Sequence, residues 1–226
     1  MSDQAIKFKK NNPNINYKNL SLAELNKLPA HVGIVNFKIS RTSFNILNIL
    51  NDDSSAVKFF WKDSHDISSL DIWFDLSTEE GLYIDVGAHT GLYTLTCLKA
   101  NKLNQVIAFE PYYLNMARLL TNLRLNTITS NVETKMDAVS NFNGISNFKI
   151  STEKSYLSKG GKISKDGKQL NTLKLDSLDL NRYNKPIKGI KIDTEGEDLN
   201  VLFGSEQIIK KYMPKIIIEV REENKK

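Results

Sequence analysis

The chain has 226 residues, of which 40% are hydrophobic and 25% charged, as in ordinary globular proteins. This length allows one domain with a substantial core. A single cysteine excludes a disulfide framework, and no apolar run approaches the roughly 18 residues of a membrane span. The first residues contain no apolar signal region, so we expect a cytoplasmic protein.

The formal net charge of +5 permits nucleic acid or an anionic surface as a partner. The excess comes from scattered lysines, however, and no arginine-rich run interleaves with aromatic residues. This pattern favours a solvated basic surface. Nucleic acid is therefore not the expected partner.

Residues 1–78 are predicted to form an arm and a small β-containing cap, and residues 79–226 a second domain. Ser21 to Glu24 reads as a capping box that opens a short helix, which Pro29 ends. Later segments with strand patterns are Val35–Ser40, Phe44–Leu50 and Val57–Trp61, and Ser69–Leu76 fits a strand or a helix.

The stretch Leu82–Gly91 reads as a buried strand that enters a tight glycine turn. Leu92, Leu95 and Leu98 then recur at helical spacing. Asp85 lies near the end of the strand, and Gly87 and Gly91 bracket the turn. A carboxylate at the end of a strand, followed by glycine, is how doubly wound folds hold nucleoside cofactors.

The spacing of the glycines indicates which cofactor this turn accepts. The pattern is D-x-G-x-x-x-G, with His89 where a dinucleotide fingerprint requires its second glycine. A bulky residue there argues against a pyrophosphate, and hence against a nicotinamide dehydrogenase. A smaller, cationic ligand whose charge Asp85 could offset fits better. S-adenosylmethionine (SAM) has these properties.

A second strand, Gln105–Phe109, ends in Glu110-Pro111. Glu110 follows Asp85 by 25 residues, which is where a βαβ unit delivers the tip of its next strand. A carboxylate there can accept hydrogen bonds from both ribose hydroxyls. Pro111 suits the first turn of the following helix, which Asn126 is expected to end.

Three motifs together resemble the FkbM-type family of SAM-dependent methyltransferases. They are Asp85-Val86-Gly87-Ala88-His89-Thr90-Gly91, Phe109-Glu110-Pro111 and Ile190-Lys191-Ile192-Asp193-Thr194-Glu195-Gly196. The resemblance covers roughly Gly81 to Val220 and rests on the order and spacing of the motifs. It implies an α/β fold, with a Rossmann-like class I methyltransferase sheet and helices on both faces.

The resemblance also implies a cofactor site along the ends of the strands. Val132–Val139 is predicted as the third strand, and the family places adenine at its end, here Asp137-Ala138. Gly189–Asp193 and Pro214–Val220 are predicted as the fourth and fifth strands. The expected SAM-binding residues are therefore Asp85, Gly87, Ala88, His89, Thr90, Gly91, Glu110, Pro111, Asp137 and Ala138.

Asp193 is the first candidate for a catalytic residue, because it ends the strand next to the cofactor strand. It could accept the proton of a hydroxyl, orient the acceptor or hold a divalent metal. Glu195 is the second candidate, whereas His89 fits a supporting role in the turn. Only three histidines occur, which argues against zinc, and the clustered acids suit Mg²⁺ better. Metal dependence stays open, and no metal ligand is assigned.

The family resemblance implies O-methylation of a sugar, glycolipid or natural-product hydroxyl. RNA methylation and a non-catalytic SAM-fold binding module are the alternatives. Ser151–Gln169, rich in lysine, serine and glycine, is predicted as a long binding loop or lid. Its five lysines lead us to expect an anionic small-molecule or carbohydrate acceptor. Asp176 could touch the site or cap a turn.

The expected strand order, 3-2-1-4-5, leaves the strand Lys215–Val220 at an edge of the sheet. Its Ile216-Ile217-Ile218 run would be a sticky edge if nothing covered it. The cap, a second copy of the chain or a continuation beyond Lys226 could cover it. We expect self-association as a homodimer.

Overall fold

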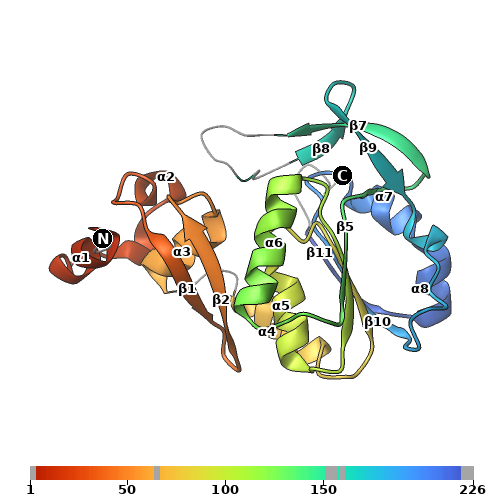
Figure 1. Cartoon of the computed structure of the whole chain (residues 1–226), viewed down its shortest axis with the longest axis horizontal. Coiled ribbons are helices and arrows are strands. Elements are labelled where there is room, and N and C mark those ends of the chain that lie inside the picture. The colour runs from red at the N-terminus through yellow and green to blue at the C-terminus, as the bar shows by residue number, and fades with distance from the viewer. Residues whose placement is uncertain (1–3, 64–66, 151–156, 158–160, 220–226) are drawn as a thin grey trace.

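The computed structural model describes residues 4–63, 67–150, 157 and 161–219. Its centre is a sheet of five parallel strands in the order β11-β10-β3-β4-β5 (Figure 1). The strands are β3 (Leu82–Val86), β4 (Gln105–Phe109), β5 (Val132–Lys135), β10 (Ile187–Ile192) and β11 (Lys215–Ile218). This is the predicted order 3-2-1-4-5, and it brings the carboxyl ends of β3, β4 and β10 together at one edge.

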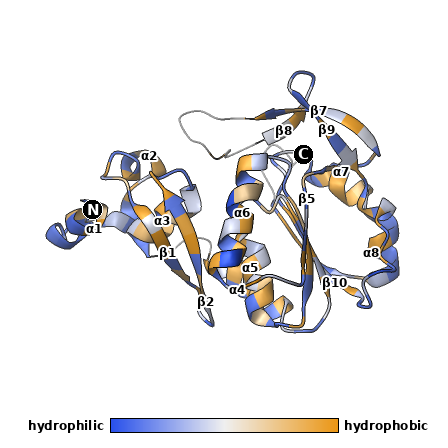
Figure 2. Cartoon of the chain, in the orientation of Figure 1, coloured by the Kyte–Doolittle hydropathy of each residue, from blue (hydrophilic) through white to orange (hydrophobic). Residues whose placement is uncertain are grey.

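Helices cover both faces of this sheet, as predicted. One face carries α4 (Ile67–Leu76), α5 (Leu92–Ala100) and α6 (Tyr113–Leu125), and the other carries α7 (Asp198–Phe203) and α8 (Glu206–Tyr212). All five residues of β3 are buried, as expected for a strand covered on both sides. Figure 2 shows apolar residues on the inner strands of this sheet and on the helices around it, whereas β5 at its edge is largely hydrophilic. No described helix is long and apolar enough to cross a lipid bilayer.

A second sheet has the order β6-β9-β7-β8 and lies beyond the carboxyl ends of the central strands. Its strands are β6 (Ala138–Val139), β7 (Gly144–Ile150), β8 (Gly161–Ser164) and β9 (Lys168–Leu173). The single strand predicted over Val132–Val139 is wrong, because the chain leaves the central sheet after Lys135 and enters this second sheet at Ala138.

The long loop predicted over Ser151–Gln169 is also wrong for its described second half. β8 and the start of β9 lie there, each paired antiparallel with β7. Their polar composition concealed strands whose hydrogen bonds come from a partner distant in sequence. Residues 151–156 and 158–160 lie outside the described part of the chain.

The N-terminal cap contains a hairpin and short helices. Its elements are α1 (Gln4–Asn11), η1 (Tyr17–Asn19), α2 (Leu22–Leu25), β1 (Val32–Lys38), β2 (Ser43–Ile49) and α3 (Ser54–Lys62). The capping box predicted at Ser21 and Glu24 is present. Ser69–Leu76, for which strand and helix were both open, lies in α4.

The strand predicted at Val57–Trp61 is wrong, because this segment belongs to α3. Asp53 caps the helix: its Oδ1 accepts hydrogen bonds from the backbone N–H groups of Ser55 (2.8 Å) and Ala56 (3.1 Å). Phe59 and Trp61 are buried in the hydrophobic interior. The helix cap at Asp53 and the burial of these side chains therefore outweigh the β-propensity of the aromatic run.

Asn122 of α6 and Asn126 at the C-terminal cap of that helix, which we call the amide ladder, join the N-terminal cap to the central domain. The amide of Asn126 accepts from the N–H of Asn45 (2.9 Å) and donates to its carbonyl (2.7 Å). The amide of Asn122 accepts from the N–H of Leu47 (2.9 Å). One turn earlier, Arg118 donates to the carbonyl of Leu47 (2.9 Å). Side chains of a helix thus occupy the free edge of β2 as a neighbouring strand would.

Asp176 lies in the short helix η2 (Leu175–Ser177) and has a structural role. Its carboxylate accepts from the N–H groups of Gln207 (3.1 Å) and Ile208 (2.9 Å), in the first turn of α8. Two roles were left open for Asp176, contact with the site or capping. The structure shows capping, of the first turn of α8.

Candidate functional site

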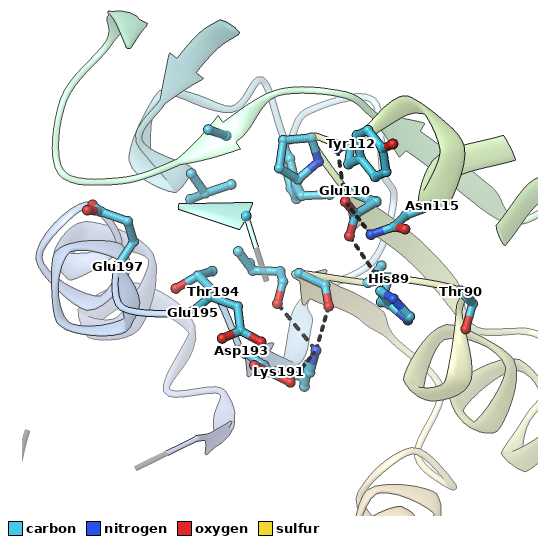
Figure 3. Close-up of a pocket in the computed structure, with 18 of the residues that line it drawn as sticks. His89, Thr90, Glu110, Tyr112, Asn115, Lys191, Asp193, Thr194, Glu195 and Glu197 are labelled. Atoms are coloured by element: carbon cyan, nitrogen blue, oxygen red, sulfur yellow. Dashed lines mark hydrogen bonds and ion pairs between the residues drawn. The ribbon is translucent and has the colours of Figure 1, made fainter. Parts of the chain in front are cut away.

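A cavity of about 230 Å³ lies at the carboxyl ends of the central strands (Figure 3). It is walled by the turns that follow β3, β4 and β10, by the first turn of α3 in the cap, and by the second sheet. The lining includes apolar groups such as Val86, Phe109 and Val139, together with several carboxylates. Such a mixture suits a ligand with a flat apolar part and polar ends.

The turn after β3 requires glycine at position 87. Gly87 has φ +75°, and a Cβ there would lie 1.8 Å from the carbonyl oxygen of Asp193. The turn is therefore in backbone contact with the end of β10. His89 also adopts a left-handed conformation, with φ +49°. The backbone of His89 is thus part of the turn itself.

Glu110 is a buried carboxylate in this pocket, 5% exposed. Its Oε2 accepts from the N–H of His89 (2.9 Å), and its Oε1 accepts from the N–H of Tyr112 (2.9 Å) and from the amide of Asn115 (3.3 Å) (Figure 3). Burial raises the pKa of Glu110, against the opposing effects of His89 and of these donors. Oε1 thus accepts two hydrogen bonds, whereas Oε2 accepts one of those described and keeps capacity for a further hydrogen bond from a ligand.

Lys191 is a buried cation inside the central sheet. Its Nζ donates to the carbonyl of Gly87 (2.8 Å) and lies 3.5 Å from Asp85 Oδ1 and 3.7 Å from Asp193 Oδ2 (Figure 3). Burial disfavours the charged ammonium, but attraction to Asp85 and Asp193 outweighs it, so the pKa of Lys191 is raised. One cation faces two carboxylates, which leaves one net negative charge at the floor of the pocket.

Asp85 does not have the position expected for it. Its side chain is 1% exposed, it is not among the residues that line the pocket, and Thr94 Oγ1 donates to its Oδ2 (2.6 Å). Its charge is balanced by Lys191 within the protein. Asp193, whose side chain is 39% exposed, is the member of this cluster that faces the cavity.

The turn after β10 is held by its own hydrogen bonds. Asp198 Oδ1 accepts from the N–H (2.8 Å) and the hydroxyl (2.9 Å) of Thr194. Glu197 Oε2 accepts from Ser140 Oγ (2.7 Å). Glu195 lies between them with φ +59° and lines the pocket. The two predicted catalytic acids therefore stand on a fixed turn.

The corner between β5 and β6 forms the far end of the cavity. Asp137 and Ala138 line it, and Asn171 of β9 donates to Asp137. Phe148 of β7 and Ile163 of β8 face the same cavity. The second sheet therefore contributes an apolar wall near the corner that is predicted to meet adenine.

The structure gathers most of the predicted site residues around one cavity. Those that line it are Gly87, Ala88, His89, Thr90, Glu110, Pro111, Asp137, Ala138, Asp193 and Glu195. Asp85 lies beneath it, and Gly91 (φ +96°) begins α5 against Leu119. Lys191 and Asn115 were missed. A lysine between two isoleucines of β10 signals Lys191, whereas nothing in the sequence singles out Asn115.

The donor set fits SAM better than a metal. Among the described residues, no group of three or more His, Cys, Asp or Glu side chains is placed to hold a metal ion. A buried carboxylate suits ribose hydroxyls, and the excess negative charge suits a sulfonium. Thr90 Oγ1 is buried and has no hydrogen-bond partner among the described residues, as expected of a group that a ligand completes.

Solved structures with similar folds include several methyltransferases. An rRNA methylase from Streptococcus thermophilus has a TM-score of 0.42 and 15% identity, over 71% of this chain and 75% of that one. A precorrin-6y C5,15-methyltransferase from Geobacter metallireducens has a TM-score of 0.43 and 12% identity, over 69% and 64%. These weak likenesses add no weight to the fold assignment, which rests on the strand order.

A SAM-dependent methyltransferase from Agrobacterium tumefaciens has a TM-score of 0.38 and 9% identity, over 48% of this chain. The chain spans only 34% of that protein's length, and 42% of a putative transferase from Pyrococcus horikoshii. No curated protein sequence matches the chain.

The family model of the methyltransferase FkbM domain matches residues 85–226, more than half of the chain. The match begins at Asp85, within β3, and contains all three motifs, the pocket acids and the other strands of both sheets around the cavity. The chain belongs to the FkbM methyltransferase family.

Proposed function

We propose that the chain transfers the methyl group of SAM to a hydroxyl of a small molecule, such as a sugar, glycolipid or natural product. The observation that carries this proposal is the carboxylate of Asp193, which faces the pocket at the tip of β10 beside the glycine turn. Family membership supports methyl transfer, and the pocket supports a compact acceptor.

SAM would be held by Glu110 at its ribose and by the corner at Asp137 and Ala138 at its adenine. When bound, SAM supplies an activated methyl group, which needs alignment and dryness more than strong acid–base help. Asp193 would accept the hydroxyl proton or its hydrogen bond, since it is the exposed partner of Lys191. Lys191 would keep that carboxylate in place.

The acceptor is expected to carry an anionic group, which the lysines of the second sheet would attract. Of these, Lys165 and Lys168 are exposed. The acids on the floor would repel the same group, so the anion belongs at the rim and the hydroxyl at the floor. Within the described residues the pocket offers no long basic groove, so RNA stays the alternative that an acceptor screen decides.

The test is an acceptor screen with radiolabelled SAM, in which sugars, glycolipids, hydroxylated natural products and RNA are compared. Asp193→Asn should lower kcat by about 10²–10⁴-fold. The dissociation constant of this variant for S-adenosylhomocysteine (SAH) should stay within a few-fold of the wild-type value. Asp137→Asn is the matched control, because it should raise the KM for SAM and leave kcat nearly unchanged.

Full activity of Asp193→Asn would remove its proposed role. Label that enters RNA alone would overturn the small-molecule acceptor. SAH binding without transfer to any acceptor would favour the non-catalytic binding module.

A further inference from the structure

Thr90 is a pocket residue whose side-chain hydroxyl lacks a hydrogen-bond partner in the described part of the chain. It is 1% exposed and lines the cavity, and Oγ1 has no hydrogen-bond partner among the described residues. Its backbone carbonyl, by contrast, accepts from the amide of Asn122 (2.8 Å). Buried hydroxyls in native proteins are nearly always satisfied. Because Thr90 also lines the cavity, its hydroxyl is available to a ligand that enters there.

The cap places two more hydroxyl residues at the same cavity. Ser54 and Ser55 form the first turn of α3, are half-buried and line the pocket. Asp53 Oδ1 already accepts from the N–H of Ser55, so this turn offers hydroxyls more than backbone donors. Asp53 Oδ2 is buried and has no hydrogen-bond partner in the described chain. The two serines therefore present hydroxyls at the cavity, next in sequence to the buried carboxylate of Asp53, which does not itself line it.

Buried polar contacts hold this turn in place. Arg118 pairs with Asp52 through Nη2 and Oδ2 (2.7 Å), and their side chains are 9% and 3% exposed. Arg118 Nη1 also donates to Asp52 Oδ1 (3.1 Å). Asn122 links Thr90 to β2, because its Oδ1 accepts from the N–H of Leu47. α6 thus fixes both the cap serines and the loop of Thr90.

The strand order indicates which end of SAM reaches these hydroxyls. Asp137 follows β5, Glu110 ends β4 and Thr90 follows β3, and these strands are neighbours in that order. With adenine at the first position and ribose at the second, the rest of the cofactor extends to the third. That remainder ends in an ammonium and a carboxylate.

We propose that the cap completes the cofactor site, and that Ser54, Ser55 and Thr90 hold the amino-acid end of SAM. The inference rests on the proposed function. Hydroxyls can donate to the carboxylate and accept from the ammonium, and the charge of Asp53 favours the ammonium. Cofactor affinity then depends on a segment outside the residues that match the family model.

Calorimetry with two ligands tests this directly. SAH contains the amino-acid end, whereas 5′-methylthioadenosine keeps the nucleoside and lacks that end. Thr90→Val and the double variant Ser54→Ala/Ser55→Ala should each weaken SAH binding at least about tenfold. Binding of 5′-methylthioadenosine should stay within twofold. Thr90→Ser should restore SAH affinity, and Ser43→Ala, on the exposed start of β2, should change neither.

Thermal unfolding without ligand separates binding from folding. Because the Thr90 hydroxyl is unpartnered, Thr90→Val should keep or raise the melting temperature of the free protein. If the variants bound SAH and 5′-methylthioadenosine equally more weakly, or bound both as well as wild type does, the inference would be overturned while the proposed function stands. A wild-type protein that binds neither ligand would overturn both.

Discussion

At the scale of single residues, Lys191 is the buried cation that balances the charge of the carboxylates at the site. In the register of the sheet it lies opposite Asp85, so a cation on β10 meets a buried carboxylate on β3. The same ammonium donates to Gly87 at the turn. One side chain therefore neutralises the strand carboxylate and steadies the cofactor turn.

Replacing this cation should be costly. Lys191→Met leaves the carboxylate of Asp85 buried without a counter-ion, and we expect a loss of about 3–5 kcal/mol in the free energy of unfolding. The double variant Asp85→Asn/Lys191→Met should recover much of this loss, because residue 85 no longer carries a buried charge that needs a counter-ion. Urea denaturation measures both. A loss below about 1 kcal/mol in the single variant would show that Asp85 is not dependent on Lys191.

The buried position of Glu110 predicts how cofactor binding depends on pH. Its pKa is raised above the ordinary value of 4.5, so protonation begins at a higher pH than for an exposed glutamate. The protonated form loses a charged acceptor for the ribose hydroxyls. SAH affinity should therefore fall as the pH is lowered through that raised pKa and strengthen as the pH rises. Calorimetry should show Glu110→Gln to be weaker and nearly independent of pH over this range.

At the scale of elements, the amide ladder decides how the cap is held. Asn126 makes two hydrogen bonds to Asn45 and a third to the carbonyl of Asn122 (2.8 Å). At about 1 kcal/mol for each bond, Asn126→Ala should cost roughly 2–3 kcal/mol of unfolding free energy. Thr121→Ala is the matched control on the same helix, because its hydroxyl bonds only within α6. It should change stability by less than about 0.5 kcal/mol.

Hydrogen exchange can place the effect at individual amides. Asn126→Ala should remove protection from the N–H of Asn45, and Asn122→Ala should remove it from the N–H of Leu47. Unchanged protection at both positions would mean that β2 does not depend on these side chains.

Local patterns located four of the central strands, and the family resemblance supplied their order. Each motif joins the end of a strand to a turn, so Gly87, Glu110 and Asp193 could be placed at strand ends from the sequence. What escaped prediction depends on partners distant in sequence. The helix α3 forms because Asp53 caps its first turn and because its aromatic side chains are buried. Lys191 meets Asp85 because the register of β10 and β3 places them side by side.

At the scale of the whole molecule, the open edge of β11 is the feature that bears on assembly. Among the described strands, β11 pairs only with β10. Ile217 packs with the helices of one face, and Ile216 and Ile218 with those of the other. The isoleucines are thus partly buried by the helices, and the backbone edge away from β10 faces no described strand. The described part of the cap lies against α5 and α6 rather than along this edge.

We propose that a second copy of the chain pairs along the edge of β11. Light scattering across a range of concentrations should then give the mass of a dimer. A monomer that stays soluble at high concentration would contradict this. Ile217→Lys should lower stability in either case, because its side chain packs in the core, and in a dimer it should also cause dissociation.

The amide ladder has a consequence for how this protein can change over time. Asn122 and Asn126 bind the main chain of β2, and every peptide presents the same N–H and carbonyl groups. Substitutions along the outer positions of the hairpin would leave these bonds intact, whereas substitutions at the two asparagines would break them. The cap could therefore acquire new surfaces, and with them new acceptors, while the joint that fixes it to the methyltransferase domain stays constant.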